Sequence, residues 1–195
     1  MGIGPFTGSA RATLGVMTAL VLGFGAFRDV LDNPSSRLAR SIDGRIVGVR
    51  QTILRGFEMP VSYERCFDQT LALAAEHRPA FVLGFGVAAG RVAALVESTA
   101  RNRANHTIAD VDGSFISEHG SGPLQIESRY AASLANALGL GCSPDAGEYV
   151  CNSWMYRVLR AGLPAAFVHL PAEGLDADRV AEGFGRFLDA EFARG

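Results

Sequence analysis

The chain contains no lysine: its 18 basic residues are all arginines, set against 20 aspartates and glutamates in 195 residues. The formal net charge is −2 and no segment concentrates positive charge, so the sequence lacks the basic surface that nucleic-acid binding requires. Cysteine is scarce too. Three cysteines are an odd number and too few for the disulfide framework of a small secreted protein, which favours reduced thiols and a cytoplasmic location.

Long hydrophobic runs are also missing. The apolar stretch 12–27 is too short to span a bilayer comfortably, and Arg11 is the only basic residue before it, which disfavours a signal peptide. We therefore expect no membrane association. Residues 1–16 are rich in small residues without a regular period, and we predict a leader or extension there. With 48% hydrophobic and 19% charged residues, positions 17–195 have the composition and length of one globular domain.

Apolar runs bounded by glycine alternate with amphipathic patterns along the chain. Strands are predicted at 18–22, at one or two places within 45–54, and at 80–83, 91–102 and 165–170. Helices are predicted at 33–42, 62–77, 125–138, 152–160 and 176–192. A turn-rich connector precedes Cys151, and the polar segment 103–123 reads as a long functional loop. The alternation predicts a single-domain three-layer α/β/α sandwich with a mostly parallel sheet.

Chemistry in such folds gathers where strands end and helices begin. Cys151 opens a predicted helix, whose positive end favours a thiolate, and His169 ends the next predicted strand. An imidazole beside the thiol can take its proton and later deliver it to a leaving amine. On spacing alone, the plainer interpretation is a buried small cysteine and a structural histidine, because buried free cysteines are common.

A family resemblance changes that balance. The segment SPDAGEYVCN resembles the nucleophile motif of pyroglutamyl peptidase I, which runs Ser-x-x-Ala-Gly-x-Tyr-x-Cys-Asn. Its fixed positions are Ser143, Ala146, Gly147, Tyr149, Cys151 and Asn152. The triplet His169-Leu170-Pro171 is similar to the His-x-Pro segment that carries the base in that family.

Two further stretches carry the resemblance. Gly90-Arg91 stands before Glu97, with Asn102 beyond it, in the order of the family's Gly-Gly-Arg, Glu and Asn. Near the start, Gly23-Phe24-Gly25-Ala26-Phe27 and Asn33-Pro34-Ser35 look like the family's Thr-Gly-Phe-x-Pro-Phe-Gly-Gly and Asn-Pro-Ser.

The resemblance implies a cysteine peptidase that removes N-terminal 5-oxoproline through a triad, without metal or cofactor. Cys151 would be the nucleophile, His169 the base and Glu97 its orienter. The substrate-binding residues would be Phe24, Phe27, Asn33 and Val87. The partner is then an N-terminally blocked peptide or small amide, and the family often forms homodimers or homotetramers.

The chain departs from the family pattern around the expected pocket. Arg28-Asp29 replaces Gly-Gly, Val87 replaces Gln, Ala89 replaces one Gly of Gly-Gly-Arg, and Thr107 replaces the Arg of Arg-Ile-Pro-Asp. These changes predict a retained triad with altered specificity. Two alternatives to the 5-oxoproline peptidase stay open: an amidohydrolase of another N-blocked or cyclic amide, and a binding protein of this fold that has lost its activity.

Other chemistries find weaker support. Positions 84–89 formally fit a dinucleotide-binding fingerprint, but the acidic residue expected about 20 positions later is missing. No metal is expected, because the polar residues of the long loop have no ligand spacing of a known site: His106, Asp110, Asp112, Glu118 and His119. A serine hydrolase is disfavoured by the lack of a Gly-x-Ser-x-Gly elbow.

Overall fold

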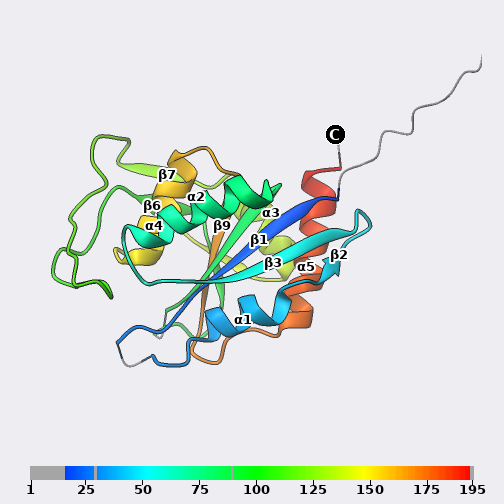
Figure 1. Ribbon diagram of the computed structural model, residues 1–195, viewed down its shortest axis with the longest axis horizontal. Coiled ribbons are helices and arrows are strands. Elements are labelled where there is room, and N and C mark those ends of the chain that lie inside the picture. Colours follow the sequence, from blue (N-terminus) through cyan, green and yellow to red (C-terminus); the bar gives the residue numbers. More distant parts are fainter. Residues whose placement is uncertain (1–15, 29, 89, 194–195) are drawn as a thin grey trace, which may run out of the picture.

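The computed structural model describes residues 16–28, 30–88 and 90–193, folded around one central sheet (Figure 1). The predicted leader (all but residue 16), Asp29 and Ala89 lie outside these described residues. The strands are β1 (Thr18–Phe24), β2 (Ile46–Val47), β3 (Thr52–Met59), β4 (Phe81–Val87), β5 (Leu95–Glu97), β6 (Thr99–Arg101), β7 (Gln125–Glu127), β8 (Gly141–Ser143) and β9 (Ala165–Leu170). The helices are α1 (Pro34–Ile42), α2 (Arg65–His77), α3 (Ala131–Leu138), α4 (Val150–Arg160) and α5 (Ala177–Glu191).

The main sheet has seven strands in the order β2-β3-β1-β4-β9-β5-β8. Four neighbouring strands at its centre, β3, β1, β4 and β9, run parallel to one another. The edge strand β2 is antiparallel to β3, and β5 is antiparallel to β9 but parallel to β8. A separate antiparallel pair is formed by β6 and β7. The sheet is therefore mixed but mostly parallel.

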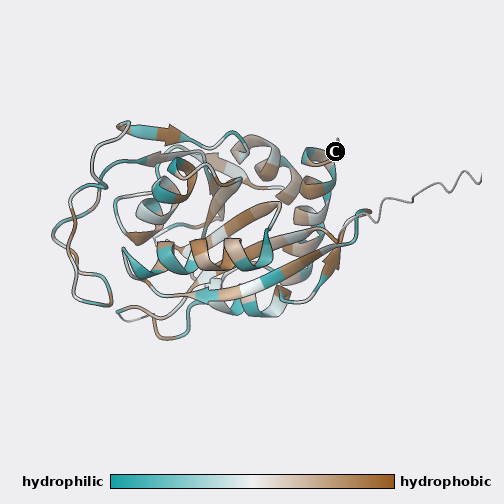
Figure 2. Ribbon diagram, turned by 45° about the horizontal axis from the view of Figure 1, so that its top comes forward, coloured by the Kyte–Doolittle hydropathy of each residue, from teal (hydrophilic) through white to brown (hydrophobic). Residues whose placement is uncertain are grey.

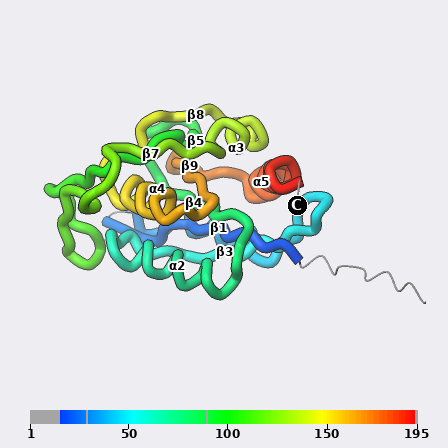
Figure 3. Tube along the Cα trace, turned by 90° about the horizontal axis from the view of Figure 1, so that it is seen from above, coloured from blue at the N-terminus to red at the C-terminus, as the bar shows by residue number. Residues whose placement is uncertain are grey.

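Helices cover both faces of the sheet, as the view from above shows (Figure 3). One apolar core joins α1, α3 and α5 to one face, and a second core joins α2 and α4 to the other. Alternate residues of each strand serve the two cores: Ala19 and Val21 of β1 face the first, whereas Leu20 and Leu22 face the second. Figure 2 shows the hydrophobic residues concentrated on the central strands. The predicted three-layer α/β/α sandwich is confirmed. Within the described ranges, none of the helices has the length and apolar character needed to cross a bilayer.

Some predicted elements have different bounds. The helix predicted over 125–138 begins only at Ala131, and the prediction was wrong for its first residues, because 125–127 form strand β7 against β6. Ile126 keeps the helical spacing of Tyr130 and Leu134, so the apolar pattern alone did not separate the two elements. Likewise β3 continues to Met59, beyond the predicted 45–54, and the turn-rich connector contains the short strand β8.

The end of β1 is fixed by its contact with α1. The strand was predicted to stop at Leu22, but it runs through Gly23 to Phe24. A Cβ atom on Gly23 would lie 2.0 Å from the carbonyl oxygen of Ser35, so only glycine lets the start of α1 pack this closely. This contact holds Phe24 at the carboxyl edge of the sheet.

Candidate active site

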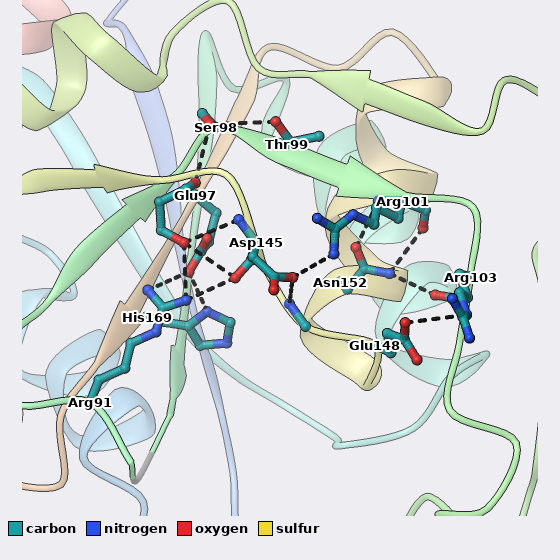
Figure 4. A network of polar contacts seen from close by, with 12 residues as sticks. Arg91, Glu97, Ser98, Thr99, Arg101, Arg103, Asp145, Glu148, Asn152 and His169 are labelled. Carbon is teal, nitrogen blue, oxygen red and sulfur yellow. Dashed lines mark hydrogen bonds and ion pairs between the residues drawn. The ribbon is translucent and has the colours of Figure 1, made fainter.

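His169 and Glu97 meet because of strand register and side-chain alternation. His169 lies near the end of β9 and shares with Phe167 the face covered by α4. In the neighbouring antiparallel strand β5, Glu97 stands opposite Phe167 in the register. Its Oε1 lies 2.7 Å from Nδ1 of His169, and the Glu97 side chain is fully buried (Figure 4). The carboxylate therefore fixes the orientation of the imidazole and directs the opposite nitrogen, Nε2, away from β5.

Cys151 reaches the same place from α4. Gly86 of β4 is the register partner of His169 in β9, and neighbouring strands lie roughly 4.8 Å apart. A Cβ atom on Gly86 would stand 2.7 Å from Sγ of Cys151, so the sulfur rests directly over this glycine. Cys151 and His169 also line one cavity. The structure thus brings together the three residues that the sequence grouped as a triad.

The cavity has a volume of about 350 Å³ and opens at the carboxyl ends of β1, β4 and β9. The four residues predicted to contact substrate all line it: Phe24, Phe27, Asn33 and Val87. Its wall is completed by Val61, Ala88, Arg91, Asp145, Ala146, Gly147, Glu148 and Tyr149. Such a chamber, mostly apolar with a few polar groups, suits a small uncharged group.

Among the described residues that depart from the family pattern, some line this cavity and others do not. Val87 lines it, whereas Arg28 and Thr107 are not among its described lining residues. Arg28 adopts a left-handed backbone with φ of 46°, a conformation that glycine reaches without strain. Arg28 therefore takes a glycine-type backbone conformation, and its exposed side chain is not part of the cavity lining.

The charge state of Cys151 differs from the expectation based on its helix position. Burial and the nearby charge of Glu97 both raise the pKa of the thiol, and its own backbone N–H acts weakly in the opposite direction. The sequence predicted a thiolate favoured by the helix N-terminus. Because the raised pKa leaves the resting thiol protonated, the sulfur needs a base to accept its proton.

Cys151 lies in the first turn of α4, at the wall of the cavity. The N-cap residue of α4, Tyr149, makes no side-chain capping hydrogen bond. The first N–H groups of a helix have no partner within the helix, so that of Cys151 is free to face a developing oxyanion.

Asn152, a motif residue to which the sequence gave no separate role, anchors this turn. Its side chain accepts from the backbone N–H of Arg101 at 2.8 Å and donates to the carbonyl oxygens of Arg101 and Arg103 at 2.9 and 2.8 Å (Figure 4). Tyr149, a residue of the cavity wall, is held in a similar way, because its hydroxyl donates to the carbonyl oxygen of Ala109 at 2.8 Å. The long loop thus holds the nucleophile segment in place.

Asn33 lines the cavity and also makes hydrogen bonds within the protein. The amide nitrogen donates to the carbonyl oxygen of Gly25, and Oδ1 accepts from both the backbone N–H and the hydroxyl of Ser35. The side chain is 1% exposed. Asn33 therefore builds part of the cavity wall by capping α1 and holding the loop after β1, and its contact with substrate stays a prediction.

This role predicts an effect on stability. We expect Asn33→Ala to lower the free energy of unfolding by about 2 kcal/mol, because it removes a helix cap and leaves buried groups unpaired. Asn33→Asp, which keeps the capping oxygen, should lose less. Urea denaturation followed by circular dichroism measures both. If Asn33→Asp lowers the free energy of unfolding as much as Asn33→Ala does, the capping role is contradicted.

Sequence reasoning gave two residues of the site no role of their own. Arg91 is part of the Gly90-Arg91 motif, and Gly86 is part of the glycine-rich stretch 84–89. Their signal was present in the sequence, since both follow the predicted strand 80–83 at the edge where functional residues are expected. Their role depends on tertiary contacts, which join Arg91 to Glu97 and Ser143 and Gly86 to Cys151.

The glycine-rich stretch is not a dinucleotide-binding turn. Gly84 and Gly86 lie inside strand β4, and β5 rather than a helix follows them. A Cβ atom on Gly84 would meet Phe167 and Trp154 at 2.6 Å, so both glycines make room for packing. Among the described residues, no group of three or more His, Cys, Asp or Glu side chains is arranged to hold a metal ion.

Comparison with known proteins gives one consistent answer. A family model described as pyroglutamyl peptidase matches residues 17–173. The chain is 28% identical over 177 residues to a pyrrolidone-carboxylate peptidase of Saccharolobus islandicus, covering 84% of each protein. It is 30% identical over 173 residues to the enzyme of that name from Cupriavidus taiwanensis, covering 79% of this chain and 78% of that protein.

Solved structures agree on the fold. The pyrrolidone carboxyl peptidase from Thermococcus litoralis superposes with a TM-score of 0.79 at 21% identity, covering 92% of this chain and 97% of that one. The family match includes all the strands and the three residues Glu97, Cys151 and His169. The chain therefore belongs to the pyroglutamyl peptidase family.

Proposed function

We propose that this protein is a cysteine peptidase that hydrolyses the amide bond after an N-terminal 5-oxoproline. One observation carries the proposal: His169, paired with Glu97 at 2.7 Å, lines one cavity with Cys151, whose sulfur lies over Gly86, the register partner of His169. The relatives named as pyrrolidone-carboxylate peptidases support the substrate class.

The mechanism follows from this geometry. His169, oriented through Nδ1 by Glu97, accepts the Cys151 proton at Nε2 while Sγ attacks the carbonyl carbon of the 5-oxoprolyl group. The N–H groups at the start of α4 stabilise the oxyanion. Collapse breaks the C–N bond, and His169 delivers the proton to the departing amine. Water, deprotonated by His169, then hydrolyses the thioester and restores the thiol.

The walls of the cavity favour an uncharged ring. Phe24, Phe27 and Val87 offer apolar surface, whereas Oδ1 of Asn33 accepts from Ser35 and one of its two amide N–H groups is donated to Gly25. Few side-chain groups therefore offer polar contact with the lactam, which supports a relaxed choice among small blocked N-termini. This is the observation that favours the second candidate, hydrolysis of another N-blocked or cyclic amide.

The test is turnover of fluorogenic amides by the purified protein under reducing conditions. We expect release of the amine from the 5-oxoprolyl amide, and none from the prolyl amide, whose ring carries a charged nitrogen that the apolar cavity disfavours. Cys151→Ala should abolish release. Turnover of an N-acetyl amide in preference to the 5-oxoprolyl amide would establish the second candidate, and turnover that survives in Cys151→Ala would reject the mechanism.

The cellular setting remains part of the proposal. All three cysteines, Cys66, Cys142 and Cys151, are free thiols, which supports a reducing cytoplasm. Assembly into a homodimer or homotetramer stays a prediction from the resemblance.

A further inference from the structure

Arg91 makes contacts that connect three parts of the site. Its Nη1 lies 2.8 Å from Oε1 of Glu97, the same oxygen that contacts His169 (Figure 4). Its Nη2 donates to the hydroxyl of Ser143 at 3.1 Å and to the carbonyl oxygen of Asp145 at 2.8 Å. Arg91 also lines the cavity, and its side chain is 22% exposed.

The contacts of Arg91 support the buried carboxylate of Glu97 and the segment that leads to Cys151. Glu97 is fully buried, and its second oxygen, Oε2, makes no hydrogen bond within the described chain. A buried carboxylate is costly without a paired charge, and Arg91 supplies that charge. Ser143 ends β8 opposite Glu97 in the register and begins the segment that leads to Cys151. One guanidinium thus touches both the orienting carboxylate and the base of the nucleophile loop.

We propose that Arg91 is a positioning residue that holds Glu97 in place for His169 and ties it to the segment carrying Cys151. The proposal rests on the proposed function, because it assigns Arg91 to the same reaction. Arg91 acts through Glu97 and the 143–145 turn, whereas Cys151 and His169 perform the chemistry.

The charge of Arg91 has a predictable influence on proton transfer. Burial and the charge of Glu97 raise the pKa of Cys151, and the guanidinium of Arg91 offsets the charge of Glu97, so removal of Arg91 makes the thiol harder to ionise. The other ionisable groups that line the cavity are Cys151, Tyr149, Asp145 and Glu148, and the two carboxylates are paired with Arg101 and Arg103. Loss of Arg91 therefore leaves Glu97 without its compensating cation.

The test compares Arg91→Met with Arg91→Lys. For Arg91→Met we expect kcat to fall by roughly 100-fold with KM within about twofold, because positioning is lost. The acid limb of the pH profile of kcat/KM should move up by about one pH unit. Arg91→Lys retains the charge, so its acid limb should stay near that of the unaltered protein and part of kcat should return. Arg186→Met, a substitution on the exposed face of α5, is the matched control and should change neither.

A substrate-free measurement separates this proposal from the proposed function. The pH dependence of iodoacetamide alkylation at Cys151, located by peptide mass spectrometry, should shift upward in Arg91→Met and much less in Arg91→Lys. If the unaltered protein turns over no amide but this shift is present, the proposed function fails and the role of Arg91 stands. Lower activity in both variants with unmoved profiles, or unchanged activity in Arg91→Met, would overturn the role. Thermal melts identify a variant that has not folded, and Arg91→Gln then replaces Arg91→Met.

Discussion

Replacing His169 by glutamine is expected to lower kcat/KM for a 5-oxoprolyl amide by about 10³- to 10⁴-fold. Glutamine can still donate to Glu97, but it can neither accept the Cys151 proton nor return it to the leaving amine. The raised pKa of Cys151 makes this loss severe, because the thiol does not ionise readily without a base. Steady-state kinetics with the fluorogenic amide, at saturating and limiting substrate, measures the effect.

His77→Gln provides the matched control. His77 lies in the last turn of α2 and its ring packs near Phe57, with ring centroids 5.4 Å apart, away from the cavity. It should keep the activity of the unaltered protein. An His169→Gln variant that retains a tenth or more of kcat/KM would show that His169 is not the base.

Gly86→Ala is expected to reduce kcat/KM by roughly 100-fold although it adds a single methyl group. The new Cβ would stand 2.7 Å from Sγ of Cys151 and 2.8 Å from Cζ of Phe167. Strand β4 is held between β1 and β9, so the strand has little freedom to retreat and the sulfur must move instead. We also expect a loss of about 1–3 kcal/mol in the free energy of unfolding, the usual effect of overpacking.

The control for this variant is Gly90→Ala. Gly90 follows β4 in an exposed turn, and a Cβ atom there would meet nothing within 4 Å. Kinetics and urea denaturation of the two variants should therefore differ sharply. Equal kinetics in Gly86→Ala and the unaltered protein would mean that the sulfur does not need the position over Gly86.

Much of the fold was predictable because its signals are local. The apolar runs of β1, β4 and β9 and the amphipathic patterns of α2 and α5 report burial directly, and they led to the correct three-layer sandwich. The pairing of Cys151 with His169 followed from their places at a helix start and a strand end, and the family resemblance strengthened it and added Glu97. The structure adds the reason for their proximity, namely that His169 and Glu97 point to the same face of two neighbouring strands.

What the sequence did not reveal depends on long-range contacts. Strand β7 has only three residues and pairs with β6 across the long loop, so its local pattern resembled a helix. The motif assigned Asn33 to substrate, which stays a prediction, and only the structure reveals its further role in capping α1 through its contacts with Gly25 and Ser35. The raised pKa of Cys151 likewise depends on burial and on the charge of Glu97, which the local sequence around the cysteine does not show.

The most direct test of the central claim is to trap the acyl-enzyme. The protein is mixed with a 5-oxoprolyl ester of a good leaving group, quenched in acid within the first turnover, and digested for peptide mass spectrometry. The mechanism predicts a 5-oxoprolyl thioester on the peptide containing Cys151, with the leaving group released in an amount equal to the enzyme. Acylation at Cys66 or Cys142, or turnover without any acyl-cysteine, would contradict it.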